Sequence, residues 1–550
     1  MKNFMPMLFT DLKSYNGNQL IKDIIAGIIV AIIALPLSIA LAIASGVGPE
    51  AGIYTAIAAG LIAAFFGGSS VQITGPTAAF ATIVAGIALD PNKGVDALAL
   101  ATIIAGILLI IMGLFKFGNL IKFIPFTITT GFTAGIAVTL LVGQLKDFFG
   151  IQYSEKPIEA LEKLHLFFNN IASVNTSAVI IGLISLAILI VWPKIKYLEK
   201  IPASFIAVIV GSVLVAVWAK DVKTIGDSLN ASLPKFKLPN NISLDGIIAI
   251  LPDAITIALL AGIESLLSCV VADGMVGKKH RSNAELTGQG LGNIASALFG
   301  GIPATGAIAR TAANVKNGGR TPVSGIVHSV VLLLVLAFFA PYAKLIPMPV
   351  IAAILISVAY NMCQWRQFVY LVKTSPKSDI LVLVTTFLLT VIFDLVVAII
   401  VGIILACVLF MKRLSDESSV ESWKYVKEMG EGEDTGLRKV EKHISVYELS
   451  GPLFFAVSNQ ISEIKPKDYT KCIILRMRAV PSIDADVLKV LKEFVEKCQH
   501  NGITVVFSHV NAQPLKAMRK SKLYDLAGAD NFCANIDKAM ERAESFRPLQ

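Results

Sequence analysis

The sequence predicts an α-helical membrane protein that crosses the bilayer many times and is followed by a small α/β domain. Of its 550 residues, 55% are hydrophobic and 16% are charged, and the mean hydropathy is +0.71. These values lie far from those of soluble globular proteins. Long apolar runs follow one another from about Asp23 to about Lys412, whereas beyond this point charged residues return and the apolar runs shorten. The predicted parts are a membrane domain (1–412), a polar linker (413–439) and a second domain (440–550).

Charge and cysteine usage exclude several classes of function. The net charge is +9, but Lys and Arg cluster in short connections between apolar runs, where they orient membrane helices rather than bind nucleic acid. The six cysteines are scattered, without the spacing of a metal site. The first residues lack the apolar core and cleavage site of a signal peptide, so the first membrane helix is expected to do its own targeting. We therefore expect a surrounding lipid bilayer, no nucleic-acid partner, no metal and no cofactor.

The apolar runs account for roughly fourteen membrane segments, counting two shorter ones that are interrupted by glycine and proline. A last long run is divided at Asp394 into two predicted short helices. The predicted full-length segments are 23–46, 51–68, 96–115, 131–145, 177–192, 203–218, 246–271, 321–340 and 349–362.

Basic residues set the predicted orientation. If the N-terminus is cytoplasmic, every second connection is cytoplasmic, and those connections carry the basic clusters. The opposite connections are short and weakly charged, or longer and mixed in sign, as in 150–173 and 220–245. We therefore expect a multi-pass protein of the cell membrane (inner or plasma membrane), with a cytoplasmic N-terminus and a cytoplasmic second domain. The basic positions are Lys116, Lys122, Lys194, Lys196, 277–281, Lys316, Arg320, Arg366, Lys373, Lys412 and Arg413.

The two interrupted segments share one pattern. The stretch 71–90 has a Gly-Pro pair, with Pro76, in its middle. Because proline is accepted in the first turn of a helix but not inside it, a helix should begin near Thr77. This helix has about twelve residues and a length of roughly 18 Å, too short for a hydrocarbon core of about 30 Å. The stretch 300–316 repeats the pattern with glycines, Pro303 and small residues. Two such half-helices in corresponding places predict an inverted-repeat secondary transporter.

Half-helix ends of this kind favour anions. The amino-terminal end of a helix presents unpaired backbone N–H groups and about half a positive charge. Two such ends that face each other near the middle of the bilayer form an anion site, and small residues let the anion approach the backbone. Arg310, one to two turns into the second half-helix, would add a full charge, which is tolerable at this depth only if it faces the cavity. The alternative is that Gly and Pro only kink packed helices and that Arg310 extends to an interface.

Glu264 is a second charged residue at membrane depth. It lies in the middle of the predicted segment 246–271, where a carboxylate is costly and could carry a proton. Ser268 follows one turn later on the same face and could donate to this carboxylate or help to coordinate a cation. Both are candidates for the coupling-ion site; the alternative for Glu264 is a structural tie that holds the half-helices. His328 could line a proton path, but a single histidine in an apolar helix is more often a hydrogen-bonded core residue.

Short β-rich runs alternate with helical patterns after the linker, which is typical of a small α/β domain. This domain resembles a STAS domain, and Asp486 lies in the turn (481–488) that anti-sigma-factor antagonists phosphorylate on serine. Because a fixed carboxylate cannot be switched like a phosphorylated hydroxyl, we expect the domain to serve trafficking, dimer contacts or cytoplasmic protein partners. The alternative for Asp486 is a helix N-terminal aspartate favoured by the helix dipole. The β-rich runs are 443–451, 471–478 and 502–510, and the helical patterns are 458–464, 485–499, 514–528 and 535–543.

The membrane domain resembles the SulP anion-transporter family, the bacterial relatives of the animal sulfate and chloride/bicarbonate exchangers. The resemblance covers nearly the whole chain and implies seven plus seven inverted segments divided into a core and a gate. It also implies an anion bound between the third and tenth segments, elevator-like alternating access, and Glu264 as the coupling carboxylate. The motifs that carry it are LPLSIALAIASGVGPEAGIYTA (35–56), ITGPTAAF (73–80), GIESLLSCVVAD (262–273) and GGIPATGAIARTAANVKNGGRT (300–321). The residues implied for the anion are Thr77, Ala78, Ala79, Phe80, Thr305, Gly306, Ala307 and Arg310, and the preceding small residue Ala304 is added to them.

Departures from the family pattern bear on substrate and coupling. Leu37 follows Pro36 where many sulfate-transporting and animal members carry Gln, so the site is less polar there. Sodium-coupled bicarbonate members carry Asp at the position of Glu264 and lack Arg at the position of Arg310. The motif PATGAIART is also similar to the branch that carries dicarboxylates. We therefore expect a proton-coupled secondary transporter of sulfate or a related oxyanion or dicarboxylate; the alternative is sodium-coupled transport of bicarbonate or a dicarboxylate.

Two rival classes of function are weighed against this one. An anion channel or STAS-linked sensing scaffold would not need Glu264, and a nucleobase transporter would need polar side chains that read a base edge. An enzyme is not expected, because no motif pairs a nucleophile with its base, and GQGLGN (288–293) has neither the preceding strand nor the spacing of a dinucleotide fingerprint. A broad gate and a cytoplasmic domain suggest a homodimer.

Overall fold

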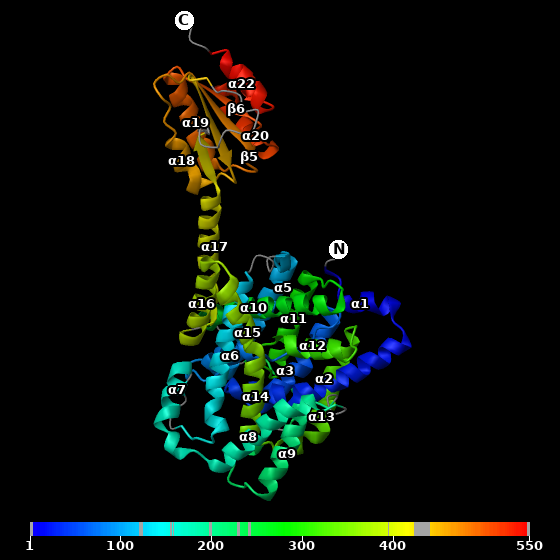
Figure 1. The fold of residues 1–550 in the computed structure, drawn as a ribbon. Helices are drawn as coiled ribbons and strands as arrows, with labels where there is room; N and C mark the ends of the chain where they lie inside the picture. Colours follow the sequence, from blue (N-terminus) through cyan, green and yellow to red (C-terminus); the bar gives the residue numbers. More distant parts are fainter. Residues whose placement is uncertain are drawn as a thin grey trace. The chain divides into compact units, whose positions relative to one another are not determined.

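The computed structural model describes residues 4–119, 125–153, 157, 159–196, 201–227, 232–239, 244–393, 395–422 and 441–546. The chain forms two compact units, Met1–Ile403 and Ile404–Gln550 (Figure 1).

The first unit is helical apart from two very short strands. Among the described residues, eight helices are long and apolar enough to cross a membrane, and three shorter apolar helices accompany them. The first half comprises α1 (Met7–Asp11), α2 (Gly17–Ala44), α3 (Pro49–Phe66), β1 (Thr74–Gly75), α4 (Ala81–Ala88), α5 (Gly94–Leu114), α6 (Phe126–Phe148), α7 (Ala160–Asn169), α8 (Thr176–Val191) and α9 (Ala203–Val217). The second half comprises α10 (Leu244–Val276), α11 (Ser282–Leu298), β2 (Thr305–Gly306), α12 (Ile308–Lys316), α13 (Val323–Ala343), α14 (Met348–Cys363), α15 (Trp365–Thr374), α16 (Lys377–Ile392) and the beginning of α17 (Leu395–Glu417), a helix that continues beyond Ile403 into the second unit.

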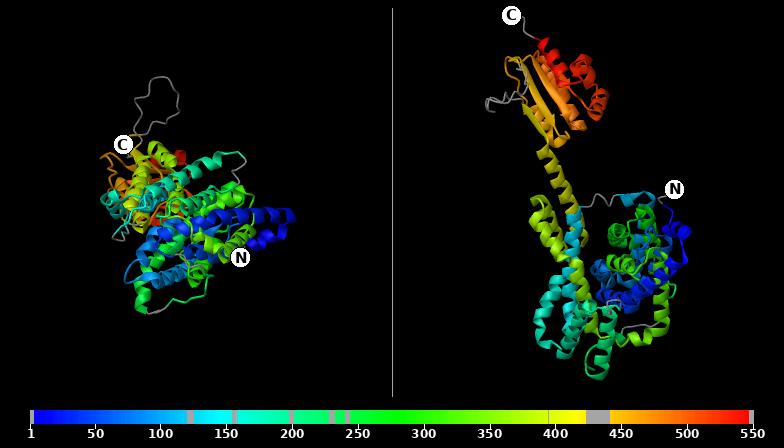
Figure 2. Two further views of the ribbon diagram at one scale, coloured as in Figure 1. Left: turned by 90° about the horizontal axis from the view of Figure 1, so that it is seen from below. Right: turned by 45° about the vertical axis from the view of Figure 1, so that its right-hand side comes forward.

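The two halves repeat one order of elements. Each begins with a long helix that contains a proline, Pro36 in α2 and Pro252 in α10, and continues with a helix, a short strand and a short helix. Four further segments complete each half: α5, α6, α8 and α9 in the first, and α13, α14, α16 and α17 in the second. The described elements therefore give the predicted seven plus seven segments. The halves interlock, since α5 packs against α10 and α11 while α13 packs against α2 and α3, so that blue and green segments lie side by side (Figure 2).

Glycine permits the close crossing of α5 and α11. A Cβ atom on Gly106 would lie 2.6 Å from the carbonyl oxygen of Gly290, and a Cβ atom on Gly290 would lie 2.5 Å from the carbonyl oxygen of Gly106. The two backbones are therefore in contact, and a larger residue at either position would force the helices apart.

A second helical bundle completes the first unit. In it α6 packs against α14 and α16, and α8 packs against α9 and α14. Glycine again allows close approach: a Cβ atom on Gly131 of α6 would lie 2.7 Å from the carbonyl oxygen of Leu383 in α16. The predicted division corresponds to a core of α2–α5 with α10–α13 and a gate that contains α6, α8, α9, α14 and α16.

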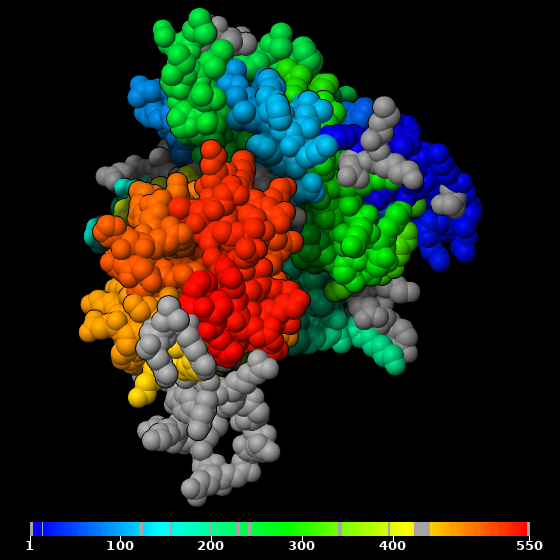
Figure 3. Space-filling model, turned by 90° about the horizontal axis from the view of Figure 1, so that it is seen from above, coloured from blue at the N-terminus to red at the C-terminus, as the bar shows by residue number. Residues whose placement is uncertain are grey.

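The second unit is built on a five-stranded sheet in the order β3-β4-β5-β6-β7. Strands β4 to β7 are parallel and β3 is antiparallel to β4. Alternate residues of β5 face opposite sides: Ile473, Leu475 and Met477 join a core with α18 to α21, and Cys472 and Ile474 join a smaller one with α22. Segments nearest the C-terminus, in red, gather on one face of this unit (Figure 3). The elements are β3 (Ser419–Ser422), β4 (Ile444–Ser450), α18 (Ser458–Ser462), β5 (Cys472–Ala479), α19 (Ala485–His500), β6 (Thr504–Ser508), α20 (Ala512–Lys520), α21 (Leu523–Ala527), β7 (Phe532–Cys533) and α22 (Ile536–Glu544).

The predicted α/β domain is confirmed: its three β-rich runs correspond to β4, β5 and β6, and its four helical patterns to α18, α19, α20 with α21, and α22. Strands β3 and β7 were not predicted, and two boundaries differ. Strand β3 lies inside the stretch 413–439 that was predicted as linker, because its sequence, Ser-Val-Glu-Ser, has no apolar run that would indicate a strand. Helix α17 is 23 residues long, so the second helix of the run predicted to divide at Asp394 is not short. Asp394 itself lies outside the described residues.

Candidate functional site

Strands β1 and β2 join the two interrupted segments. They pair antiparallel, with Thr74 opposite Gly306 and Gly75 opposite Thr305. Each strand leads into a short helix: β1 into a 3₁₀ turn (Ala78–Phe80) continued by α4, and β2 into α12. Because the strands are antiparallel, the two half-helices run toward opposite faces of the unit and their amino-terminal ends lie close together. This is the arrangement that the two Gly/Pro patterns predict.

Neither half-helix begins with a side-chain cap. Thr77 precedes the first half-helix and Ala307 precedes the second, and within the described part of the chain neither side chain makes a capping hydrogen bond. The residues that follow Thr77 are packed closely, with Ala78 7% exposed and Phe80 fully buried. Ala304 is held by Asn293, whose side chain accepts from its N–H at 2.8 Å and donates to its carbonyl at 2.9 Å.

Glu264 contacts the first half-helix. It lies in α10, and its Oε2 accepts a 2.9 Å hydrogen bond from Thr77 Oγ1. The hydroxyl at the cap position is thus turned toward the carboxylate of another helix and not toward its own backbone. No ion pair joins Glu264 to Arg310 in the described part of the chain.

Two serines of α10 contact the second interrupted segment. Ser265 Oγ lies 2.6 Å from Thr305 Oγ1 and accepts from the N–H of Gly306 at 3.0 Å. Ser268 Oγ donates to Thr311 Oγ1 at 3.5 Å, so this hydroxyl is turned to α12 and not to the carboxylate of Glu264. Sequence reasoning missed Ser265, which stands next to Glu264 in GIESLLSC; the helical spacing of four residues pointed to Ser268 instead.

Arg310 lies in the first turn of α12, earlier in the half-helix than predicted, because the helix begins only at Ile308. Its guanidinium Nη2 donates to the carbonyl of Pro76 at 2.7 Å, which links the two broken segments. The side chain is 1% exposed, and its Nε and Nη1 have no hydrogen-bond partner among the described residues. A Cβ atom on Gly75 would collide with Nη1. Arg310 does not line the cavities described below.

A buried polar network, which no pattern in the sequence indicates, supports the strand pair. Glu285 Oε2 accepts from the N–H groups of Gly68 and Ser69 at 2.8 and 3.1 Å. Its Oε1 accepts from the amides of Gln72 and Gln289, each at 2.8 Å. The run 288–293, which is no dinucleotide fingerprint, therefore has a structural role through Gln289.

His328 of α13 is fully buried. Both of its ring nitrogens lack a hydrogen-bond partner among the described residues. It is therefore not the hydrogen-bonded core histidine that is the more common case in an apolar helix.

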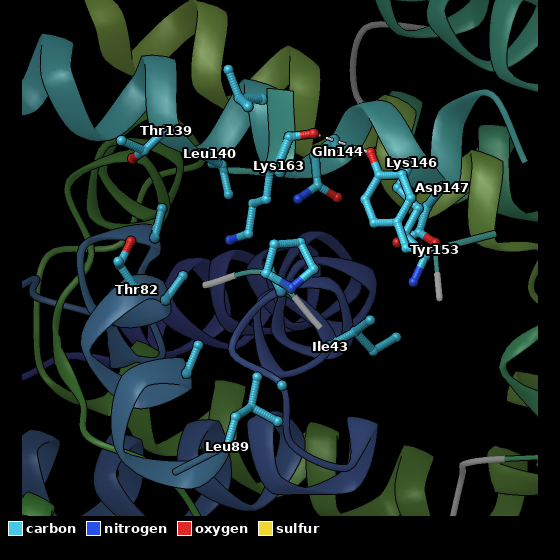
Figure 4. Close-up of a pocket in the computed structure, with 18 residues that line it drawn as sticks. Ile43, Thr82, Leu89, Thr139, Leu140, Gln144, Lys146, Asp147, Tyr153 and Lys163 are labelled. Carbon is cyan, nitrogen blue, oxygen red and sulfur yellow. Dashed lines mark hydrogen bonds between the residues drawn. The ribbon is translucent and has the colours of Figure 1, made fainter. Parts of the chain in front are cut away.

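A cavity of about 330 Å³ opens between α4 of the core and α6 of the gate (Figure 4). We call it the access cavity; its lining includes Ala78, Thr82, Leu140, Gln144, Tyr153 and Lys163. A neighbouring cavity of about 270 Å³ shares Thr82, Thr139 and Lys163 with it. Ala78, at the beginning of the first half-helix, thus borders a space that extends to the carboxyl-terminal ends of α4 and α6.

Asp486 is exposed in the first turn of α19, where the sequence placed it. The cap of this helix is Asp484, which was not singled out: its Oδ1 accepts from the N–H of Val487 at 2.9 Å and its Oδ2 from that of Phe455 at 2.8 Å. Asp486 therefore adds negative charge to a helix end that is already capped.

Comparisons with known proteins cover both units. Residues 20–386 match the model of the sulfate permease family, and residues 438–539 match that of the STAS domain. YvdB of Bacillus subtilis (strain 168), provisionally named a sulfate transporter, is 39% identical over 536 residues, 96% of this chain and 98% of YvdB.

Two solved structures share the fold. The transmembrane domain of a cyanobacterial bicarbonate transporter, BicA, matches 71% of this chain and 98% of its own length, with 30% identity and a TM-score of 0.62. The murine anion transporter Slc26a9 in its inward-facing state matches 98% of this chain and 94% of its own, with a TM-score of 0.87; at 17% identity this likeness concerns the fold alone. Both parts of the predicted resemblance are confirmed.

Proposed function

Since the chain belongs to the sulfate permease family and is an anion transporter of that family, we propose that it is a secondary active transporter of sulfate or a related oxyanion or dicarboxylate, coupled to protons. The observation that carries this proposal is the pairing of β1 with β2, which brings two uncapped half-helix ends together. Such paired ends suit an anion at membrane depth.

The anion is bound by backbone and by charge. Thr77, Ala78, Ala79 and Phe80 form the first half-helix end, and Thr305, Gly306 and Ala307 form the second. Since the N–H groups of Gly306 and Ala307 already donate to Ser265 Oγ and to the carbonyl of Ile73, the second end offers the N–H groups of the first turn of α12. Arg310, whose Nε and Nη1 have no partner among the described residues, adds a full positive charge to the two helix dipoles. The names of the relatives suggest two candidate substrates, sulfate from YvdB and bicarbonate from BicA.

Glu264 carries the coupling proton. When ionised it accepts the hydrogen bond from Thr77; when protonated it loses its negative charge and can itself donate. The proton would therefore change both the charge and the hydrogen bonding of the first half-helix end when the anion binds. Sodium is the alternative coupling ion, with Glu264 and the hydroxyl of Thr77 as oxygen ligands; the hydroxyl of Ser268 would have to turn away from Thr311 to join them.

The anion crosses when the core moves past the gate. The half-helices belong to the core, and the access cavity separates α4 from α6 of the gate. An elevator-like movement of the core along the gate would carry the site from one face to the other. The basic connections favour a cytoplasmic N-terminus and a cytoplasmic STAS domain in an inner or plasma membrane. We also propose a homodimer, and a cytoplasmic protein partner for the STAS domain at the helix end that carries Asp486.

Uptake into proteoliposomes tests this proposal. Labelled sulfate, bicarbonate and fumarate are offered under an imposed inward proton or sodium gradient to the native chain and to Glu264→Gln, with Glu463→Gln, on the exposed surface of the second unit, as a matched control. Accumulation of one anion under a proton gradient, reduced to simple exchange in Glu264→Gln only, supports the proposal. Equilibration without accumulation under either gradient would favour an anion channel.

A further inference from the structure

The access cavity holds a charged side chain that the proposed function does not use. Lys163 lies on α7, in the connection of mixed charge between α6 and α8, and lines both neighbouring cavities. In Figure 4 its side chain points into the cavity, as does that of Gln144. Among the described residues its ammonium has no carboxylate within ion-pair distance.

The described lining of the cavity carries a net positive charge. Among the residues that the structure describes, it contains two lysines, Lys146 and Lys163, and one acidic residue, Asp147, which leaves one positive charge. The ammonium of Lys146 lies over the ring of Tyr153 in the cavity wall, with Nζ 5.3 Å from the ring centre. Tyr153 in turn donates to the backbone carbonyl of Lys163 at 3.4 Å, a long hydrogen bond between the wall and α7. Of the two lysines, Lys163 is therefore the one whose ammonium is not held against an aromatic ring of the wall, and the nearby Glu159 lines only the neighbouring cavity.

Burial makes this charge costly. It lowers the pKa of the Lys163 ammonium, and only the neighbouring Glu162 opposes the shift. An ammonium that is partly removed from water, with no carboxylate at ion-pair distance among the described residues, would be stabilised by an anion in the cavity. With about 330 Å³ the cavity holds roughly ten water volumes, enough for a small anion and part of its hydration shell.

The cavity also leads to the half-helix end. Ala78, the first residue of the 3₁₀ turn after Thr77, lines the same cavity as Lys163. Gln144 and Thr82 add an amide and a hydroxyl that can donate hydrogen bonds to an oxyanion. An anion held by Lys163 would thus already be inside the space that reaches the proposed transport site.

We propose that the access cavity is a second anion site, in which the Lys163 ammonium holds a small oxyanion or carboxylate before it passes to the half-helix ends. This proposal rests on the proposed function, because the anion is the transported one. It assigns to α7 the capture of the anion, while Arg310 and the half-helices carry it across. A merely structural lysine would instead hold α7 in place without regard to its charge.

Three variants of the full chain in proteoliposomes test the charge of Lys163: Lys163→Met, Lys163→Arg and, as a matched loss of charge from the same cavity, Lys146→Met. We expect Lys163→Met to raise the KM for labelled sulfate about tenfold while kcat at saturation stays near the native value, because capture and steering by charge act at low anion concentration. Lys163→Arg should keep the native KM, and Lys146→Met should change it less. An unchanged KM in Lys163→Met, or a loss of kcat shared by all three variants, overturns the proposal.

Chemical restoration of the charge adds a readout that a structural role would not give. In Lys163→Cys, a methanethiosulfonate reagent that attaches an ammonium should lower the raised KM, and one that attaches a sulfonate should raise it further. The native chain, with its six cysteines, receives the same treatment as control. Equal effects of the two reagents count against the site.

Equilibrium binding separates this proposal from the proposed function. Binding of [35S]sulfate to the purified full chain is measured at low ionic strength, without any gradient. If no anion accumulates in vesicles but sulfate binding weakens about tenfold in Lys163→Met and not in Lys163→Arg, coupled transport fails and the second site stands. If the native chain and Lys163→Met bind sulfate equally, or the native chain does not bind it, the second site fails.

Discussion

Thr77 and Glu264 are 187 residues apart in the sequence, yet Thr77 Oγ1 donates a 2.9 Å hydrogen bond to Glu264 Oε2. The bond joins the beginning of one half-helix to the carboxylate proposed to carry the coupling proton. Thr77→Val keeps the shape of the side chain and removes the donor. Because a hydrogen bond to a charged group contributes about 1.5–3 kcal/mol, we expect the initial rate of gradient-driven anion uptake to fall about tenfold or more.

Two further variants control this prediction. Thr77→Ser retains a hydroxyl and should keep most of the uptake. Thr102→Val also removes a buried hydroxyl, but that of Thr102 donates to the carbonyl of Leu98 in its own helix, at 2.7 Å, and its loss should leave coupled uptake intact. Equal losses in Thr77→Val and Thr102→Val would mean that general destabilisation, and not the contact with Glu264, limits uptake.

The close contact between Gly75 and Arg310 predicts that Gly75→Ala is less stable than the native protein. A Cβ atom on Gly75 would collide with Arg310 Nη1, so Gly75→Ala should cost about 1–3 kcal/mol, as overpacking of a core does. The measurement is the temperature at which half of the detergent-solubilised protein has unfolded. Gly86→Ala serves as the matched control, because an added Cβ there meets nothing within 4 Å.

A double variant tests the cause of that loss. In Gly75→Ala with Arg310→Met the colliding nitrogen is gone, so the two losses of stability should not add. Full additivity would place the strain of Gly75→Ala elsewhere.

Local chemistry made the half-helices predictable. Pro76 and Pro303 restrict the backbone whatever surrounds them, so the sequence alone placed a helix start near Thr77. The pairing of β1 with β2 has no such local cause, because two-residue strands carry no periodic pattern and their partners lie in different halves of the chain. Helical spacing likewise identified Ser268 as a neighbour of Glu264, but only the packing of β2 against α10 decided that Ser265 contacts Gly306.

Isolated charges were the hardest features to interpret. Lys163 stands in a connection with charges of both signs, and nothing in its neighbours shows that it points into a cavity beside α4. Strand β3 was missed for a similar reason, since the polar sequence Ser-Val-Glu-Ser becomes a strand only by pairing with β4. In both cases the decisive partner is distant in sequence, so a local pattern could not reveal it.

Substitution of Asp484 and substitution of Asp486 should affect the stability of the first turn of α19 differently. Asp484 caps the helix through the N–H of Val487, whereas Asp486 is exposed in its first turn. We expect Asp484→Ala to destabilise this turn by about 1 kcal/mol, which is roughly a fivefold faster hydrogen exchange of its amides. Asp486→Ala should change exchange less, because a helix dipole at the surface contributes only about 0.3–1 kcal/mol. Hydrogen exchange on the full chain, read by mass spectrometry, measures both, and a larger effect at Asp486 would contradict the assignment of the cap.

The buried thiols of Cys472 and Cys498 in the second unit should react far more slowly with an alkylating reagent in the native protein than in the unfolded one. Burial raises the pKa of the Cys472 thiol to about 12 and that of Cys498 to about 11. Since only the thiolate reacts with iodoacetamide, and a raised pKa reduces the thiolate at a given pH, at most about one in a thousand of these groups is reactive at pH 8 in the folded chain. We therefore expect both residues to stay unlabelled at pH 8 in the native protein and to be labelled in urea, where the pKa returns to its ordinary value. Mass spectrometry of the peptides measures the labelled fraction at each cysteine against time. Labelling of Cys472 in the native chain as fast as in urea would mean that β5 is not buried between the two cores, because its thiol is held in the smaller core beside α22.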